Sequence, residues 1–350
     1  MIKHFNIAVL PGDGIGVDVT CEALRVLQAL ESHLTDVKFI FKEHAVGAGE
    51  YLRSGDPLPT TTLDACAAAD AVLLGAMGLP SVRWPDGKEM TPQIDLREKL
   101  DLYAGPRPIR LFHGDDTPLK GYQTGEIDFV IVRENTEGLF SGRLSTHPSD
   151  DESRDVLRLT RKGCERIIRF AFELARKRRR HCTLVDKANV LPSMVFFRSI
   201  FDQIAAEFPD VTTERVYVDA MALFLVRKPQ AYDVIVTENM FGDILSDLAG
   251  GLVGGMGMAP SGDIGEKCAV FQPSHGTAPD IAGKGIANPV AMILSTAMML
   301  DWLGHEQTII GARKIENAVQ HVFSNPSNRT PDMNGKLTTS GITDLIIAAL

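Results

Sequence analysis

Short apolar runs typical of β-strands alternate with helical patterns through most of this chain. The runs that we expect to form strands are FNIAVL, VKFIF, DAVLLGAMG, DFVIVREN, CTLVDKAN, TERVYVD and YDVIVTEN. Apolar residues at helical spacing follow several of these runs, at Leu191 to Phe208, Ala220 to Val226 and Gly242 to Leu252. Because strands that alternate with helices are usually joined by crossover connections, the pattern predicts an α/β protein with largely parallel strands.

Size and charge narrow the classes of protein to which the chain can belong. With 350 residues there is room for two domains or one large one. A formal net charge of -9 argues against a nucleic-acid-binding surface. The basic run RKRRRH at 176–181 closes a long helical pattern, and we interpret it as a solvated helix end rather than a nucleic-acid patch.

Cysteine usage and hydropathy indicate the compartment. The 5 cysteines are scattered, and none forms a CxxC pair. This spacing predicts neither a disulfide framework nor a structural zinc site, and it is typical of a reducing cytoplasm. The apolar run near the start is too short for a signal peptide, and no apolar stretch is long enough to span a membrane. We therefore expect a cytoplasmic protein without membrane or nucleic-acid partners.

The first strand-like run ends in a glycine-rich turn, LPGDGIGVDV. Gly12 and Gly14 match the start of the GxGxxG fingerprint of Rossmann domains, but Val17 stands at its third small position. Asp13 adds a carboxylate to a loop that would have to bind a diphosphate. We therefore interpret the motif as a tight turn that needs glycine backbone angles, and we do not expect a Rossmann fold.

Polar clusters follow four of the expected strands, in RENTE, DKANV, VDAM and TENMFGD. In open α/β sheets, ligands bind outside the carboxyl ends of the strands, so these clusters mark the expected site. Asp243 and Asp247 are four residues apart on an expected helix and therefore lie on one face. With Asp219 as a third carboxylate they suit Mg²⁺ or Mn²⁺. Alternatively, Asp243 compensates the helix dipole and Asp247 is merely solvated.

Cationic residues near the same strand ends suggest acid–base chemistry and anion binding. Lys187 ends an apolar strand, where desolvation lowers the pKa of an amine enough for it to act as a base. The alternative is a surface lysine at the start of a loop. Arg97, Arg107 and Arg133 carry planar guanidinium groups that bind carboxylates, although each alone is also typical of a surface. Together with a metal they would hold a small polycarboxylate.

A long loop rich in glycine and proline, FQPSHGTAPDIAGKGIANP, follows in the last third of the chain. Long loops inside compact domains are usually functional. The segment HGTAPDI suits a nucleotide, with Asp280 accepting hydrogen bonds from a ribose diol. A carboxylate at this point favours NAD over NADP because it would repel a 2′-phosphate.

The motifs taken together resemble those of the β-decarboxylating dehydrogenases, which act on 3-isopropylmalate, isocitrate, homoisocitrate and tartrate or D-malate. The segments that carry the resemblance are LPGDGIG, LR…RP, RENTEG, DKANVL, VD, FGDILSDLAGGLVGGMGMAPSGDIG, HGTAPDIAGKGIANP and RTPDMNGK. They extend over nearly the whole chain. GDILSD and HGTAPDIAGKGIANP are highly specific, and DKANV is moderately so.

The resemblance implies a two-domain α/β fold of the isopropylmalate/isocitrate dehydrogenase type. Residues 1–100 and 254–350 would form a large cofactor-binding domain. Residues 101–253 would form a small domain with the substrate and metal residues and the dimer interface. In this family one subunit extends its lysine and aspartate into the neighbouring site, so a homodimer with shared active sites is expected, with Lys187 and Asp219 supplied by the neighbour.

The resemblance also implies roles for individual residues. Arg97, Arg107 and Arg133 would hold the malate-type backbone, and Asp219, Asp243 and Asp247 the metal. Lys187 and Asp219 would be catalytic, with Asn189 beside them. The expected cofactor residues are His275, Gly276, Ala278, Asp280, Ile281, Asn288 and Asp332. Metal and Lys187 would favour oxidation of a 2-hydroxy acid by NAD, followed by loss of the β-carboxylate as CO₂ and protonation of the enol.

Two departures from the family pattern bear on this mechanism. Phe140 stands where the family has a tyrosine credited with protonating the enol, and phenylalanine has no proton to donate. Gln272 replaces the glutamate that many relatives carry before the cofactor loop. The alternative interpretation is therefore a non-catalytic or weakly active regulatory paralogue that binds nucleotide and a citrate-like ligand.

Substrate choice is the other open point. Isopropylmalate dehydrogenases carry leucines before the first arginine to contact the isopropyl group, and here the matching residues are Gln93 and Ile94. Isocitrate dehydrogenases carry a serine and an asparagine, where this chain has Thr91 and Gln93. A buried amide facing an isopropyl group would lack a partner, at a cost of about 1–3 kcal/mol. Thr91 and Gln93 thus favour a hydroxylated or carboxylated side group.

Overall fold

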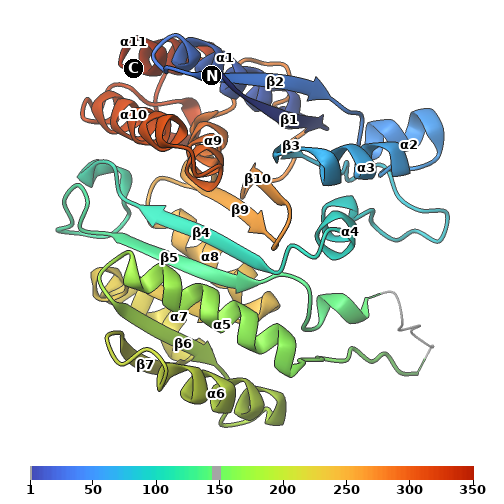
Figure 1. The fold of residues 1–350 in the computed structure, drawn as a ribbon, viewed down its shortest axis with the longest axis vertical. Helices are drawn as coiled ribbons and strands as arrows, with labels where there is room; N and C mark the ends of the chain where they lie inside the picture. Colours follow the sequence, from blue (N-terminus) through green and yellow to red (C-terminus); the bar gives the residue numbers. More distant parts are fainter. Residues whose placement is uncertain (1, 144–150) are drawn as a thin grey trace.

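The computed structural model describes residues 2–143 and 151–350. Its strands form one sheet in the order β2-β1-β3-β10-β9-β4-β5-β8-β6-β7 (Figure 1). The strands are β1 (Lys3–Gly12), β2 (Val37–Glu43), β3 (Ala71–Ala76), β4 (Ala104–Arg110), β5 (Asp128–Glu134), β6 (His181–Asp186), β7 (Thr212–Tyr217), β8 (Val234–Thr237), β9 (Pro260–Ile264) and β10 (Ala269–Pro273).

Helices cover both faces of this sheet, as expected for an α/β protein. The α-helices are α1 (Ile15–Glu31), α2 (Ala48–Ser54), α3 (Thr60–Ala68), α4 (Pro92–Lys99), α5 (Arg161–Arg176), α6 (Pro192–Ala205), α7 (Val218–Arg227), α8 (Asn239–Gly251), α9 (Val290–Trp302), α10 (Glu306–Phe323) and α11 (Thr339–Ala348). Short 3-10 turns include one at Phe140–Gly142. The predicted α/β class is confirmed.

Side-chain alternation along β1 explains why it is covered on both sides. Ile7 and Val9 belong to the same buried cluster as the apolar stripe of α1, whereas Ala8 and Leu10 belong to a second cluster with residues of α3 and α4. Successive residues of a strand point to opposite faces, so a continuous apolar run buries both faces. In the other half of the sheet, α5 lies in front of β5 and β6, and α7 and α8 lie behind (Figure 1).

The prediction of largely parallel strands is confirmed for six of the nine strand pairings among the described residues. The centre of the sheet differs, because β10–β9, β9–β4 and β4–β5 are antiparallel. The sequence did not indicate β4, β9 or β10. β4 carries two prolines, which lack the N–H that a central strand needs, and it pairs with β9 at Ala104 alone.

The glycine-rich turn after β1 is a backbone crossing. A Cβ on Gly12 would lie 1.9 Å from the Ala76 carbonyl oxygen, and one on Gly14 would lie 2.1 Å from that of Thr277. Asp13 is buried, and its carboxylate accepts hydrogen bonds from the backbone of Ala48, Gly49 and Gly78. The carboxylate thus joins three loops. The expectation of a fold other than Rossmann is confirmed, since the central strands are antiparallel.

The two chain ends lie in the same half of the molecule, where α1 packs against α11 (Figure 1). The division into residues 1–100 with 254–350 and residues 101–253 stays a prediction, and the sheet continues across it through the pairing of Ala104 with Ile264. Among the described residues, no helix combines the length and the apolar character needed to span a membrane.

Arginines of the basic run at 176–181 form ion pairs, so the run does more than end a solvated helix. Arg178 donates to the buried carboxylate of Asp233 and to Asp128, and Arg176 pairs with Asp210. These ion pairs connect the end of α5 to residues at or just before the N-terminal ends of β5, β8 and β7.

Candidate active site

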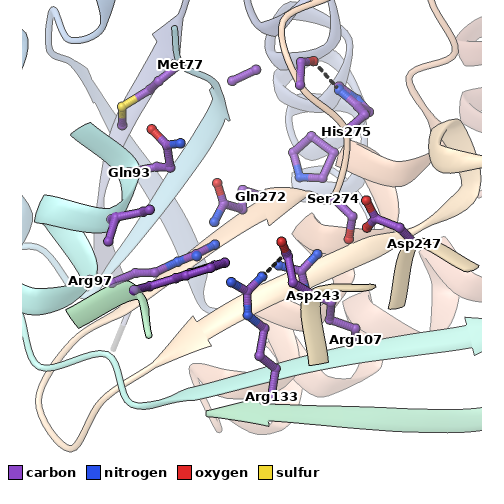
Figure 2. A pocket seen from close by; sticks show the side chains of 15 residues that line it. Met77, Gln93, Arg97, Arg107, Arg133, Asp243, Asp247, Gln272, Ser274 and His275 are labelled. Carbon is purple, nitrogen blue, oxygen red and sulfur yellow. Dashed lines mark hydrogen bonds and ion pairs between the residues drawn. The ribbon is translucent and has the colours of Figure 1, made fainter. Parts of the chain in front are cut away.

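A cavity of about 220 Å³ lies between the two halves of the sheet (Figure 2). Its lining comes from α4, β4, β5, α8 and the loop after β10. The residues are Ala76, Met77, Gln93, Ile94, Arg97, Arg107, Arg133, Phe140, Asp243, Asp247, Gln272, Pro273, Ser274, His275 and Gly276. The structure therefore brings together the three predicted arginines and two of the three predicted metal carboxylates, from Arg97 to Asp247 in the sequence.

Arg107 is a buried cation in the wall of the cavity. Its side chain is buried, its Nε lacks a hydrogen-bond partner, and no described residue accepts a hydrogen bond from it. Burial and the neighbouring charge of Arg97 lower the pKa of Arg107. A buried cation without a partner is costly, so this site calls for an anionic ligand.

Arg133 at the end of β5 is positioned by α8. Its Nε and Nη2 donate to Asn239 Oδ1 at 3.0 and 2.7 Å, and its Nη1 donates to Asp243. α8 can approach this closely because residue 242 is glycine, where a Cβ would lie 2.7 Å from the Arg133 side chain. Burial, and then the charges of Arg107 and Arg97, lower the pKa of Arg133 to about 9.

Asp243 and Asp247 lie on the same face of α8, as their spacing predicts, and both face the cavity (Figure 2). Asp247 makes no hydrogen bond to a described residue. The walls of the cavity and the charge of Asp243 raise the pKa of Asp247. Within the described part of one chain, no group of three His, Cys, Asp or Glu side chains could hold a metal ion. Two carboxylates alone therefore form an incomplete cation site.

α8 itself begins at a residue that the sequence analysis did not assign. Glu238 is buried at the N-cap position, and its carboxylate accepts hydrogen bonds from the backbone N–H groups of Met240 and Phe241 at 3.1 and 2.7 Å. The sequence signal was weak, because the preferred N-cap residues are Ser, Thr, Asp and Asn, and glutamate is not among them. Glu238 thus sets the start of the helix that carries Asp243 and Asp247.

Phe140 faces the cavity from the short 3-10 turn. Its ring centroid lies 5.4 Å from the guanidinium carbon of Arg133, which is within range of a cation–π interaction. The aromatic ring therefore keeps a packing role even though it carries no hydroxyl group. No proton can come from this position in the present chain.

A second cavity of about 390 Å³ adjoins the first, and His275 lines both. Its lining residues are Ile15, Gly257, His275, Ile281, Ile286, Ala287, Asn288, Pro331 and Asp332. Asn288 Nδ2 donates to Asp332 Oδ2 at 3.1 Å. The Nε2 of His275 is buried and has no hydrogen-bond partner among the described residues, and burial lowers the pKa of His275, which favours the neutral imidazole. The two segments that the sequence analysis connected to a nucleotide thus meet here.

Some predicted cofactor residues lie elsewhere. Gly276 lines the first cavity, whereas Ala278 and Asp280 line neither cavity, and Asp280 is exposed. Ile15, which follows the opening glycine turn, was not predicted as a lining residue. Its backbone N–H donates to the Thr277 carbonyl at 2.8 Å, so the opening turn lies directly against the HGTAPDI loop.

Lys187, Asp219 and Asn189 do not line either cavity of their own chain. Lys187 Nζ lies 2.6 Å from Asp219 Oδ1, and this pairing lowers the pKa of Asp219. Asn189 is exposed. In a single chain the lysine is therefore not drawn into an apolar pocket. A role for these three residues requires that they meet another copy of the site.

The two residues that bear on the substrate side group behave differently. Gln93 lines the first cavity from α4, and its buried Oε1 accepts a hydrogen bond from none of the residues that the structure describes. Thr91 occupies the N-cap position of α4 and does not line the cavity, although its carbonyl accepts from Ile94 N at 2.9 Å. Only Gln93 therefore offers an amide to a ligand.

Comparison with known proteins adds to this geometry. A sequence model of the family described as isocitrate/isopropylmalate dehydrogenase matches residues 6–346. The chain is 41% identical over 362 residues to a 3-isopropylmalate dehydrogenase of Aquifex aeolicus, covering 100% of this chain and 98% of that protein. It is 45% identical over 339 residues to the 3-isopropylmalate dehydrogenase of Moorella thermoacetica, covering 94% and 93%.

Solved structures show the same likeness in three dimensions. An isocitrate dehydrogenase from Methylococcus capsulatus has a TM-score of 0.89 at 39% identity, covering 99% of each chain. A β-decarboxylating dehydrogenase from Thermococcus kodakarensis in its apo form has a TM-score of 0.81 at 39% identity, covering 99% of this chain and 96% of that one. Since these relatives are named for different substrates, the likeness indicates a shared reaction type rather than one acid.

Proposed function

Because this chain belongs to the isocitrate/isopropylmalate dehydrogenase family, we propose that it catalyses the NAD-dependent oxidative decarboxylation of a 3-substituted malate with Mg²⁺ or Mn²⁺. The observation that carries this proposal is the buried guanidinium of Arg107, which donates a hydrogen bond to no described residue and faces a cavity that Arg97 and Asp243 also line. A small dicarboxylate satisfies the cations of such a site.

The metal site is proposed from the donor set. Asp243 and Asp247 supply hard oxygen ligands, which suit Mg²⁺ and Mn²⁺. Asp219 would complete the site from the neighbouring subunit, since its own chain holds it beside Lys187. When bound, such a cation would polarise the oxygen on C2 of the acid.

A homodimer is supported by exposed apolar residues on α7, on α8, which packs against it, and on the turn after β6, the elements that also carry Asp219, Asp243 and Lys187. Leu223 and Val226 on α7 and Ile244 on α8 are 54%, 44% and 59% exposed, and Val190 follows the DKAN turn at 65%. Exposed apolar residues that gather on one surface are typical of an interface. In the proposed dimer this surface is covered, and Lys187, Asn189 and Asp219 reach the neighbouring cavity.

NAD is proposed for the second cavity, with Ile281, Asn288 and Asp332 in its wall. His275 lies at the junction, where it would contact both cofactor and substrate. Asp280, exposed on the same loop, favours NAD over NADP because its charge would repel a 2′-phosphate. When bound, NAD would accept the hydride from C2.

The chain's own residues would perform the remaining work. Arg97 and Arg107 orient the two backbone carboxylates, and Lys187 of the neighbouring subunit accepts the proton of the 2-hydroxyl group. Oxidation at C2 makes the bond to the β-carboxylate labile. That bond then breaks, CO₂ leaves, and its electron pair forms an enol that is protonated at C3. Because residue 140 is phenylalanine, we assign this proton to Lys187 or to water.

The side group of the acid is proposed from Gln93. The Gln93 amide has a buried Oε1 that accepts from no described residue and could accept from a hydroxyl substituent, while its Nε2 could donate to a carboxylate, so it favours a side group as in tartrate or isocitrate over an isopropyl group. The 3-isopropylmalate dehydrogenase relatives bear that acid in their names, so it belongs in any comparison.

The test is NADH production by the pure protein with Mn²⁺ against malate, tartrate, isocitrate and 3-isopropylmalate. We expect turnover on at least one acid, dependence on Mn²⁺, and a preference for NAD over NADP. Turnover should disappear in Lys187→Ala. A folded dimer that binds these acids without turning any over would instead support the regulatory paralogue that Phe140 and Gln272 suggest.

A further inference from the structure

Asp263 is a buried carboxylate that the sequence analysis did not assign. It lies on β9, 2% exposed, behind the first cavity. Its oxygens accept hydrogen bonds from Arg97 Nε at 2.9 Å, Asn135 Nδ2 at 2.8 Å and Gln272 Nε2 at 2.5 Å. The three donors come from α4, from the loop after β5 and from β10, so Asp263 connects elements that lie far apart in the sequence.

Gln272 donates to the same carboxylate oxygen as Arg97. A glutamate at position 272 would bring a second carboxylate within hydrogen-bonding distance of Asp263 in a buried site. Two carboxylates in that arrangement do not both ionise, because each raises the pKa of the other. The amide at 272 and the carboxylate at 263 are therefore chemically complementary.

The hydrogen bond to Asp263 occupies Nε of Arg97 and leaves its two terminal nitrogens available to a ligand. Nε of Arg97 is held by Asp263, whereas Nη1 and Nη2 donate to no described residue, and Arg97 lines the first cavity. These two nitrogens form the fork that binds a carboxylate bidentately. Asp263 also supplies negative charge close to Arg107 and Arg133, and its charge raises the otherwise lowered pKa of each.

We propose that Asp263 and Gln272 form one positioning unit for Arg97, in which Asp263 carries the negative charge that a glutamate at 272 would otherwise supply. The unit orients Arg97 toward a ligand carboxylate and keeps only one negative charge behind the guanidinium. The identity of that ligand as a malate-type acid rests on the proposed function.

The experiment compares four proteins: the wild type, Asp263→Asn, Gln272→Glu and the double variant Asp263→Asn/Gln272→Glu. Asparagine and glutamine can exchange donor and acceptor roles, so Asp263→Asn removes the charge while hydrogen bonds can re-form. We expect each single change to raise the Kd for the acid, measured calorimetrically with Mn²⁺, by about tenfold or more. The double variant restores the single charge and should bind within about threefold of wild type.

The same four acids named above serve as probes, and kinetics on any acid that turns over should show KM rising more than kcat falls. The matched control is Asp233→Asn, which removes another buried carboxylate hydrogen-bonded to an arginine, at the opposite ends of the strands. It should lower the thermal unfolding temperature without changing the Kd. If Asp263→Asn does not fold, Gln272→Glu and the double variant still give the comparison.

Two results would overturn the positioning unit: a double variant that binds no more tightly than its weaker single parent, or an Asp263→Asn protein that binds like the wild type. Lack of binding of all four acids by the wild type would likewise overturn it. Binding and rescue without NADH production would leave the unit standing and refute the proposed reaction. Turnover without rescue would support the proposed reaction and refute the positioning unit.

Discussion

At the residue scale, the first cavity concentrates buried charge of both signs. Arg97, Arg107 and Arg133 face Asp243 and Asp247, with Asp263 behind them. Burial lowers the pKa of Arg107 and Arg133, while it raises that of Asp247. The lowered pKa values of the two arginines indicate a site for an anion, and the raised pKa of Asp247 indicates a site for a cation. In the proposed function, a malate-type acid together with a divalent cation would supply both.

Phe140→Tyr tests where the final proton comes from. The ring lies against Arg133, and a tyrosine preserves that contact while it adds a hydroxyl group in the cavity. A positioned acid usually contributes about 10²–10⁴-fold to a rate, so we expect kcat to rise by about 10²-fold or more. The measurement is steady-state NADH production on the best substrate. An unchanged kcat would show that Lys187 or water already protonates the enol efficiently.

Glu134 should make stability depend on pH. It is buried at the end of β5, and burial raises its pKa to about 7 although Thr136 and Glu137 donate hydrogen bonds to it. The folded state therefore binds a proton more readily than the unfolded state, and this contribution to stability is lost as pH rises from about 5 to about 7.

The measurement is the free energy of unfolding in urea at several pH values for the wild type and Glu134→Gln. Across this interval the wild type should lose about 1–3 kcal/mol relative to the variant, whose amide does not titrate. Curves that stay parallel would contradict the assignment.

At the element scale, α8 is the helix on which the site depends. Its N-cap is Glu238, its close approach to β5 depends on Gly242, and its exposed face presents Asp243 and Asp247 to the cavity. Small residues and a cap at the start of a helix fix its position more firmly than propensity alone.

Glu238→Ala should therefore damage both stability and metal use. Removal of the cap leaves two backbone N–H groups without partners, at a cost of about 1–2 kcal/mol in unfolding free energy. Since the first turn of α8 then frays, we expect the Mn²⁺ concentration for half-maximal activity to rise several-fold. Thr338→Ala removes the cap of α11, which accepts from Gly341 N at 3.0 Å, and should reduce stability without changing the Mn²⁺ dependence.

At the scale of the whole molecule, two of the residues assigned to the proposed site lie away from the cavities of their own chain. Lys187 and Asp219 form an ion pair outside both cavities of their own chain, next to the exposed apolar residues of α7 and α8. The proposed dimer supplies these two residues to the neighbour, so every site would contain residues of both subunits.

Mixed dimers test this sharing directly. Lys187→Ala and Arg107→Ala homodimers should both be inactive. A heterodimer of the two has one native site, so random mixing should restore about a quarter of the wild-type activity. Mixing Lys187→Ala with Asp219→Ala should restore nothing, because both residues come from the same side of each site. Activity in neither mixture, with heterodimers verified, would argue against shared sites.

Sequence by itself determined the α/β class, two of the four strand-end clusters that border the cavity, and the three arginines and two of the three aspartates that line it. These properties follow from local patterns, because the burial periodicity of a strand or helix is apparent within a short stretch of consecutive residues. The rejection of a Rossmann turn was also correct on local grounds, since Asp13 and Val17 do not suit a diphosphate loop.

Only the tertiary structure decided the antiparallel centre of the sheet, the role of Asp263 and the separation of Lys187 from its own cavity. Strands with prolines, such as β4, carry no local signal of pairing, and the contact from Arg97 to Asp263 spans 166 residues. Such contacts depend on the order in which strands associate, which no short stretch of sequence specifies. The negative charge next to Gln272 is therefore identified only in the tertiary structure, where Asp263 of β9 carries it.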